Sequence, residues 1–283
     1  MSYVNMTDML AKAKREKYAV GAFNIVDYNS MLAVVRAAEE LSAPVIVQTS
    51  VKTVRFWGHK PLVAWMKQLA ADSPVPIAMH LDHCKEVDFV RQCIEAGWSS
   101  VMIDASAQPF EQNLAATQQV VKLAGAAVSV EAEMGEIGGV EEDIVVAEAD
   151  AKLADPDKAE AFCKDLDLAV FAPAIGTAHG VYKGEPKVDF DRIETIAKRT
   201  GLPIALHGGT GLAEDVFKKC ISLGCAKVNI STQIKYAFID GFVEYHQQKQ
   251  QYEPLKPLGA QFERIKKEVA EKIKLFGSAG KAK

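Results

Sequence analysis

Short apolar runs alternate with amphipathic segments along most of the chain, and the apolar runs are mostly continuous. Strands of a parallel sheet that is covered by helices have such continuously apolar sequences. The apolar runs predict strands at Val20–Ile25, Pro44–Thr49, Pro76–His80, Ser100–Asp104, Ala127–Glu133, Ala169–Ile175, Pro203–His207 and Lys227–Ile230. The amphipathic segments predict helices at Tyr28–Leu41, Val87–Ala96, Phe110–Leu123, Phe190–Lys198 and Ala213–Leu223.

The order of these segments predicts an α/β fold. Eight strand–helix units match a (β/α)8 TIM barrel, which we expect to form a single domain over residues 1–283. Charged helical patterns beyond Gln233 predict extra C-terminal helices outside the barrel. An open doubly wound sheet is the alternative, but candidate functional residues at several different strand ends favour a closed barrel.

The segment Glu136–Asp155 is acidic and has no strong periodicity, so we expect a long mobile loop there. Loops of this length in compact domains are usually functional. The acidic residues Glu141–Asp143 within it are either a solvated charge run or a source of a base that loop closure brings to an active site.

Composition narrows the classes of function. The 283 residues are 49% hydrophobic with a formal net charge of −4, which argues against nucleic acid as a partner. The apolar runs are too short to span a bilayer, and the charged residues from Lys12 to Lys17 argue against a secretory signal. Five cysteines without CxxC spacing predict reduced thiols, so we expect a cytoplasmic protein without a membrane partner.

Three of the six histidines end apolar runs at predicted strand ends: His83, His179 and His207. The carboxyl ends of parallel barrel strands meet at one mouth, so three imidazoles would converge there. Three protein ligands leave the fourth position of a catalytic zinc ion open. A single histidine at a strand end is more often structural, but three together favour a zinc site.

Glycines and hydroxyl residues follow the late predicted strands in the sequences GTAHG, HGGTG and NIST. Glycine lets backbone amides approach a phosphate, and Thr210, Ser231 and Thr232 add hydroxyl donors. Ordinary turns use the same residue types. Three such loops, two of them with a candidate zinc ligand, instead favour an enzyme that acts on a phosphorylated small molecule.

Several carboxylates lie close to the candidate zinc ligands. Asp82 could transfer a proton to or from a metal-bound substrate. His80 is more typical of a residue that packs in the core or contacts a metal ligand. Glu131 and Glu133 share one face of the fifth predicted strand, where they need a cation or hydrogen-bond donors. With Asp104, they would orient or replace the metal ligands, or form structural salt bridges.

These motifs occur together and in order. The sequences HLDH, VMIDAS, VEAEMGEIGG, EED, AIGTAHG, LHGGTGL and KVNIST resemble those of the class II, zinc-dependent fructose- and tagatose-bisphosphate aldolases. The resemblance runs from YAVGAFNI to FGSAGKA, nearly the whole chain. It implies a (β/α)8 barrel that reversibly cleaves a ketose bisphosphate to dihydroxyacetone phosphate and an aldehyde, glyceraldehyde 3-phosphate or an analogue.

The resemblance also implies roles for individual residues. Asp82 would be the proton donor or acceptor at the cleaved carbinol, and Glu141 would handle the C3 proton of dihydroxyacetone phosphate. The Zn²⁺ ligands would be His83, His179 and His207. The phosphate-binding residues would be Gly180, Gly209, Thr210, Asn229, Ser231 and Thr232. A monovalent cation, Na⁺ or K⁺, would assist phosphate binding, and the protein would be a homodimer or homotetramer.

Zinc chemistry removes the need for a Schiff-base lysine. Lys227 begins its predicted strand and Lys52 lies beyond the end of another, so neither is expected to be a buried amine at the barrel mouth.

The sequence departs from the family's usual pattern at the distal end of the substrate. Members that act on 1,6-bisphosphates usually carry Asp-Pro-Arg, whose arginine holds the distal phosphate, where this chain reads YEPL at Tyr252–Leu255. Asn24 and Ser50 match family positions around that end. Either another basic residue binds the anion, or the substrate ends in a sulfonate or an uncharged group. The basic candidates are Lys52, Arg55 and Lys60.

Two other classes of function compete with the aldolase hypothesis. A zinc hydrolase of the amidohydrolase type would carry a His-x-His pair on the first strand, where this chain has Asn24. A noncatalytic companion subunit of a tagatose-type aldolase would not need to retain the three histidines together with Asp82 and Glu141. We therefore expect an active class II aldolase.

Overall fold

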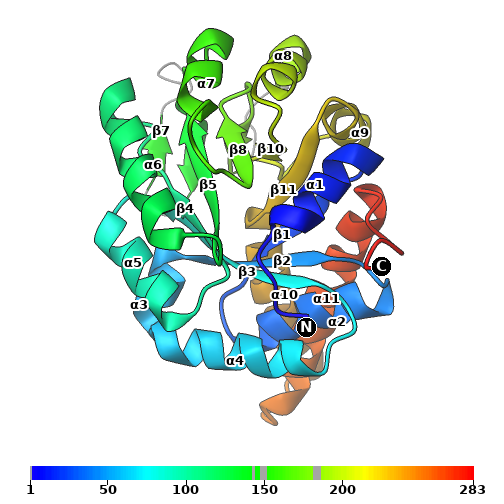
Figure 1. The fold of residues 1–283 in the computed structure, drawn as a ribbon. Helices are drawn as coiled ribbons and strands as arrows, with labels where there is room; N and C mark the ends of the chain where they lie inside the picture. Colours follow the sequence, from blue (N-terminus) through cyan, green and yellow to red (C-terminus); the bar gives the residue numbers. More distant parts are fainter. Residues whose placement is uncertain (1, 142–143, 147–151, 181–185) are drawn as a thin grey trace.

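The computed structural model describes residues 2–141, 144–146, 152–180 and 186–283. Its centre is a closed barrel of parallel strands in the order β1-β11-β10-β8-β5-β4-β3-β2 (Figure 1). These strands are β1 (Val20–Asn24), β2 (Val45–Ser50), β3 (Ile77–Cys84), β4 (Ser100–Ile103), β5 (Ser129–Met134), β8 (Val170–Pro173), β10 (Ile204–Leu206) and β11 (Cys225–Ile230). Pairing of β1 with β11, with Val20 opposite Lys227, closes the ring. The predicted (β/α)8 barrel is confirmed.

Helices cover the outside of the strands (Figure 1). They are α1 (Thr7–Glu16), α2 (Tyr28–Glu40), α3 (Val51–Trp57), α4 (His59–Ala71), α5 (Val87–Ala96), α6 (Phe110–Ala124), α7 (Pro156–Cys163), α8 (Phe190–Thr200), α9 (Glu214–Ser222), α10 (Thr232–Lys249) and α11 (Leu255–Leu275). The five predicted helices correspond to α2, α5, α6, α8 and α9. None of the helices in the described ranges combines the length and apolar character needed to span a membrane.

Helix α1 packs against the amino-terminal part of the barrel. Met6 and Leu10 are fully buried and belong to one apolar cluster with Ala22, Ala78 and Ala205 of the barrel strands. Burying large side chains against such small ones fills the space at this end of the barrel.

The sequence predicts a long loop between β5 and α7, but this segment contains two short strands. Strand β6 (Gly138–Glu141) pairs antiparallel with β7 (Ile144–Val146) and parallel with β9 (Ala178–His179). Gly139 lies opposite His179, and a Cβ atom at this glycine would stand 2.1 Å from the His179 carbonyl oxygen. Strand β9 is about forty residues away from β6, so the local pattern does not indicate this pairing.

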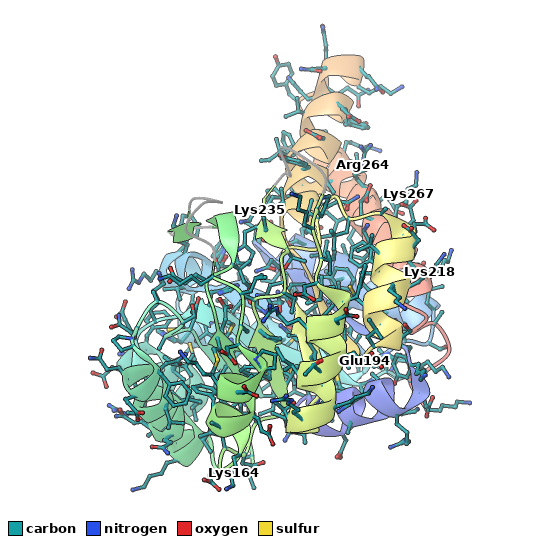
Figure 2. The ribbon with its side chains drawn as sticks, turned by 90° about the horizontal axis from the view of Figure 1, so that it is seen from above. Lys164, Glu194, Lys218, Lys235, Arg264 and Lys267 are labelled. Atoms are coloured by element: carbon teal, nitrogen blue, oxygen red, sulfur yellow. The ribbon has the colours of Figure 1, made fainter. Side chains whose placement is uncertain are left out.

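The predicted C-terminal helices pack outside the barrel. The Asn29 side chain on α2 donates to Gln261 on α11 at 2.9 Å, and Lys266 on α11 forms an ion pair with Glu40 at 3.0 Å. Figure 2 shows that α10 and α11 project together beyond the other helices on the side marked by Arg264 and Lys267. The C-terminal helices thus combine contacts to the barrel with a protruding surface.

Candidate metal centre and active site

Three imidazoles converge at the carboxyl end of the barrel. His83 comes from β3, His179 from β9 and His207 from the residue after β10. Their candidate ligand atoms lie within 4.8 Å of one another, and the Nε2 atom of His83 is 2.8 Å from the Nδ1 atom of His207. The sequence predicts His179 at the end of a barrel strand, but β8 ends at Pro173 and His179 lies in the separate strand β9.

The His83 ring is oriented by Asp104 at the end of β4. The Nδ1 atom of His83 is 2.9 Å from a carboxylate oxygen of Asp104, and the other oxygen of Asp104 accepts from the hydroxyl of Ser106 at 2.7 Å. Burial alone would lower the pKa of His83, but the carboxylates of Asp82 and Asp104 raise it well above its ordinary value. Carboxylates that bind the outer nitrogen of a histidine are common beside metal sites.

The His83 backbone supports the same arrangement. Its φ of 47° is in the left-handed region, which residues with a Cβ atom rarely adopt.

The Glu133 carboxylate also lies beside His83, with an oxygen 3.7 Å from Nδ1. His83, Asp104 and Glu133 form a second group of candidate metal ligands. Burial and the charge of Asp104 raise the pKa of Glu133 well above its ordinary value.

His207 is held by a charge network inside the barrel. Its Nε2 atom is 2.7 Å from one oxygen of Glu131, and the other oxygen of Glu131 is 2.9 Å from the Lys227 ammonium. Lys227 also donates to Asn229 at 2.6 Å. Burial lowers the pKa of His207 well below its ordinary value, which favours the neutral ring that metal binding requires. With Nε2 facing Glu131, Nδ1 faces His83.

Asp82 is buried among amide donors. Asn24 donates to one of its oxygens at 2.9 Å, Gln48 to the same oxygen at 3.3 Å, and Asn229 to the other at 3.2 Å. Burial alone would raise the pKa of Asp82, but the positive charges of His83 and Lys227 lower it. Asp82 is therefore a carboxylate, and Gln48 is a partner that the sequence analysis missed.

The three glycine- and hydroxyl-containing loops come together beside His179. They line a small cavity formed by His179, Gly180, Gly208, Gly209, Thr210, Asn229, Ser231 and Thr232. A Cβ atom at Gly208 would stand 2.4 Å from the Ala178 carbonyl oxygen, so glycine permits this close approach of two loops. The buried Ser231 hydroxyl has no hydrogen-bond partner among the described residues. Together with the first turn of α10, these groups suit an anion.

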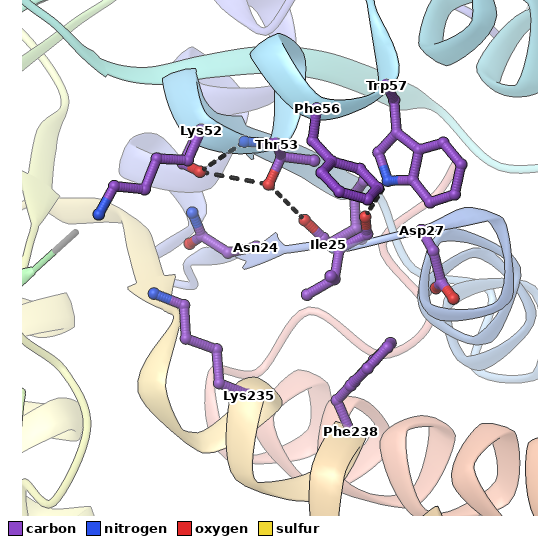
Figure 3. Close-up of a pocket in the computed structure, with 11 residues that line it drawn as sticks. Asn24, Ile25, Asp27, Lys52, Thr53, Phe56, Trp57, Lys235 and Phe238 are labelled. Atoms are coloured by element: carbon purple, nitrogen blue, oxygen red, sulfur yellow. Dashed lines mark hydrogen bonds between the residues drawn. The ribbon is translucent and has the colours of Figure 1, made fainter.

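A larger cavity of about 430 Å³ is lined in part by Asn24, which donates to Asp82 (Figure 3). Asn24, Ser50 and Lys52 line it, which is where the sequence analysis expects the distal end of a substrate. Arg55 and Lys60 do not line this cavity, and Arg55 instead forms an ion pair with Glu86 at 2.7 Å.

Some sequence predictions lie at the edge of what the structure describes. Glu141 ends β6, two residues beyond the glycine that pairs with His179. Glu142 and Asp143 lie outside the described residues. His80 is fully buried, with Nδ1 2.7 Å from the Ser100 hydroxyl and Nε2 3.4 Å from the Glu131 carboxylate.

Comparison with known proteins decides the family. The model of the family described as fructose-bisphosphate aldolase class-II matches residues 4–281. The chain belongs to this family. A fructose-bisphosphate aldolase of Geobacillus stearothermophilus is 44% identical over 287 residues, covering 100% of this chain and 99% of that protein. It follows that the protein is a class II aldolase, a carbon–carbon lyase.

Two further relatives of this class II aldolase extend the comparison. A sulfofructosephosphate aldolase of Alkalicoccus urumqiensis is 38% identical over 285 residues, covering 100% of this chain and 99% of that protein. The crystal structure of the YdjI aldolase from Escherichia coli K12 superposes with a TM-score of 0.88 at 30% identity, covering 99% of this chain and 100% of that chain. The similarity to these relatives therefore covers the whole chain, although their names give different kinds of aldolase.

Lys227 of the class II aldolase differs from the sequence-based expectation, because its amine is buried. It is fully buried, although its position at the start of a predicted strand did not indicate a buried amine. Strand β11 begins at Cys225, two residues earlier, so Lys227 lies within the barrel. Its ammonium group neutralises Glu131, which explains why a charged residue is tolerated there.

We predict that Lys227→Met destabilises the aldolase by about 3–5 kcal/mol, because it leaves the Glu131 carboxylate buried without its cation. Urea unfolding measures this loss. The double variant Lys227→Met/Glu131→Gln removes both charges, keeps an acceptor for His207, and should recover much of the stability. Lys218→Met, which breaks an exposed pair with Glu214, is the control and should cost less than about 1 kcal/mol. Equal losses for the two single variants would contradict the assignment.

Proposed function

We propose that this class II aldolase is zinc-dependent and reversibly cleaves a phosphorylated ketose to dihydroxyacetone phosphate and an aldehyde. The observation that carries the proposal is the placement of three imidazoles, the Asp82 carboxylate and the glycine-rich cavity at one barrel mouth. A metal, a proton-transfer group and an anion site are the elements that retro-aldol cleavage of a sugar phosphate requires.

The substrate we propose is a ketose 1,6-bisphosphate of the fructose or tagatose type, with glyceraldehyde 3-phosphate as the aldehyde. The name of the Geobacillus stearothermophilus relative supports this choice. The sulfofructosephosphate aldolase relative supports an alternative in which the distal group is a sulfonate. Release of dihydroxyacetone phosphate from a panel of ketose phosphates tests both.

The proposed zinc ligands are His83, His179 and His207. Support comes from the facing Nε2 atom of His83 and Nδ1 atom of His207, each with its other ring nitrogen beside a carboxylate. This donor set fits a catalytic zinc site with one open position. A bound zinc ion would act as a Lewis acid on substrate oxygen. Asp104 and Glu133 would orient His83.

Two carboxylates are proposed to move protons. Asp82 is held as a carboxylate by Asn24 and Asn229, and would transfer a proton at the C4 hydroxyl. Glu141 would transfer the C3 proton of dihydroxyacetone phosphate. Its place in β6, which pairs with the strand that carries His179, supports this second role.

The small cavity beside His179 is proposed to bind the substrate's 1-phosphate. Its glycines permit close approach of backbone amides, and the buried Ser231 hydroxyl would gain a partner. The six residues proposed to contribute are Gly180, Gly209, Thr210, Asn229, Ser231 and Thr232. A Na⁺ or K⁺ ion beside this phosphate stays a prediction, which comparison of activity in the two salts would test.

We predict that His179→Ala removes bound zinc, from about one ion per chain to none, because a catalytic site has only three protein ligands. Metal analysis by mass spectrometry checks this, and circular dichroism checks the fold. Asp104→Ala should weaken zinc binding by about 10–100-fold, since it frees the outer nitrogen of His83. The control is His246→Ala on α10, away from the site. Stoichiometric zinc in His179→Ala would refute the ligand set.

We predict different defects for the two proton-transfer residues. Asp82→Asn should retain zinc but lower kcat for cleavage by about 10²–10⁴-fold, as expected for a lost general acid–base group. Glu141→Gln should slow the exchange of the C3 proton of dihydroxyacetone phosphate with solvent. Zinc content, cleavage rate and tritium exchange are measured for both variants. Wild-type rates of cleavage and exchange in both would show that the roles are wrong.

We also propose a homodimer or homotetramer. Tyr236, Ile239 and Val243 repeat on α10 at a spacing of three or four residues and are each at least 40% exposed. Such a stripe on a protruding helix suits contact with a second copy. Light scattering should give a mass of two or four chains, and Ile239→Glu should lower it. A monomeric wild-type protein would contradict this.

The remaining proposals concern domain organisation and location. Contacts of α11 with α2 support one barrel domain over residues 1–283. The five cysteines are buried and unbonded to one another, which supports a reducing, cytoplasmic location.

A further inference from the structure

The cavity of about 430 Å³ is lined by a residue that contacts the proposed catalytic carboxylate. Asn24, which donates to Asp82, forms part of its wall. The other walls come from the residues after β1, from α3 and from the second turn of α10. A cavity of this size is in the range of small-molecule sites. It therefore has room for the part of a substrate that lies beyond the reacting carbons.

Two lysines enter this cavity from opposite walls. Lys52 extends from α3 and Lys235 from α10, and Figure 3 shows their ammonium groups directed toward the same space beside Asn24. Much of the remaining wall is apolar and includes Phe56 and Phe238. Positive charge in a weakly polar enclosure attracts anions more strongly than the same charge in open water.

Asp27, Ser50 and Trp57 also line the cavity, and their hydrogen bonds shape its walls. The Asp27 carboxylate accepts from the backbone and hydroxyl of Ser30, both at 2.8 Å, and caps α2. The Ser50 hydroxyl accepts from the Thr53 backbone at 3.2 Å and caps α3. The Trp57 indole donates to the Val26 carbonyl at 2.7 Å. Among the described residues that line the cavity, the cationic ones are Lys52 and Lys235.

Helix α10 links this cavity to the proposed phosphate site. Thr232 is its first residue and lines the small cavity beside His179, whereas Lys235 lines the larger one. Three residues of helix span about 4.5 Å along its axis. One rigid turn therefore sets the positions of groups that face both ends of a substrate.

We propose that Lys52 and Lys235 form a two-lysine clamp for an anionic group at the distal end of the substrate, opposite dihydroxyacetone phosphate. This assignment rests on the proposed aldolase function. Because an ammonium is a point charge without the bidentate geometry of a guanidinium, the clamp accepts a phosphate or a sulfonate. It selects against an uncharged terminus.

The test compares three ketose 1-phosphates that differ only at C6, which carries a phosphate, a sulfonate or a hydroxyl. The value of kcat/KM for release of dihydroxyacetone phosphate is measured for wild type, Lys52→Met, Lys235→Met and the double variant. Each single variant should lower the preference for an anionic over an uncharged C6 group by about tenfold or more. The matched control is Lys60→Met on α4, a nearby exposed lysine outside the cavity, which should keep the wild-type preference.

The outcomes separate the clamp from the aldolase proposal. A preference for phosphate or for sulfonate that depends on both lysines supports the clamp and identifies the natural group. A wild type that cleaves all three substrates equally, or keeps its preference in the double variant, overturns the clamp alone. A wild type that neither cleaves any of them nor exchanges the C3 proton of dihydroxyacetone phosphate overturns the proposed function, and the clamp with it.

Discussion

The buried Glu131 carboxylate is the charge on which the rest of the site depends. It is fully buried, and its ion pair with Lys227 and its contacts with His207 and His80 make this burial tolerable. Lys227 also donates a hydrogen bond to the Asn229 side chain, and Asn229 donates to Asp82. One network thus fixes a candidate zinc ligand and the candidate proton-transfer group, because rotating any member would leave a buried polar atom without a partner.

Around this network, different elements contribute the candidate zinc ligands and the walls of the two cavities. Strands β3 and β10 bring His83 and His207 together, while the small sheet of β6, β7 and β9 adds His179 from outside the barrel. Helix α10 contributes Thr232 to the glycine-rich cavity and Lys235 to the larger cavity. A rigid scaffold of this kind can keep its reaction and change its substrate through a few residues of one cavity.

Much of the site could be predicted from the sequence because its signals are local. Continuous apolar runs followed by His83 or His207 indicate parallel strands that end in candidate ligands. Glycine and hydroxyl residues after the late strands indicate anion-binding loops. All strands of a (β/α)8 barrel are parallel, so their carboxyl ends, and the residues that follow them, lie at the same mouth.

Contacts between residues remote in sequence were decided only by the tertiary structure. Glu131 and Lys227 are 96 positions apart, and neither residue type by itself indicates a partner inside a barrel. The same holds for Gly139 beside His179, and for Lys235 across the cavity from Lys52. The amino-acid sequence by itself determined the alternation of strands and helices and the chemistry at strand ends, because periodicity is set by neighbours along the chain. Which charges face one another depends on closure of the barrel, which places distant segments within hydrogen-bond distance.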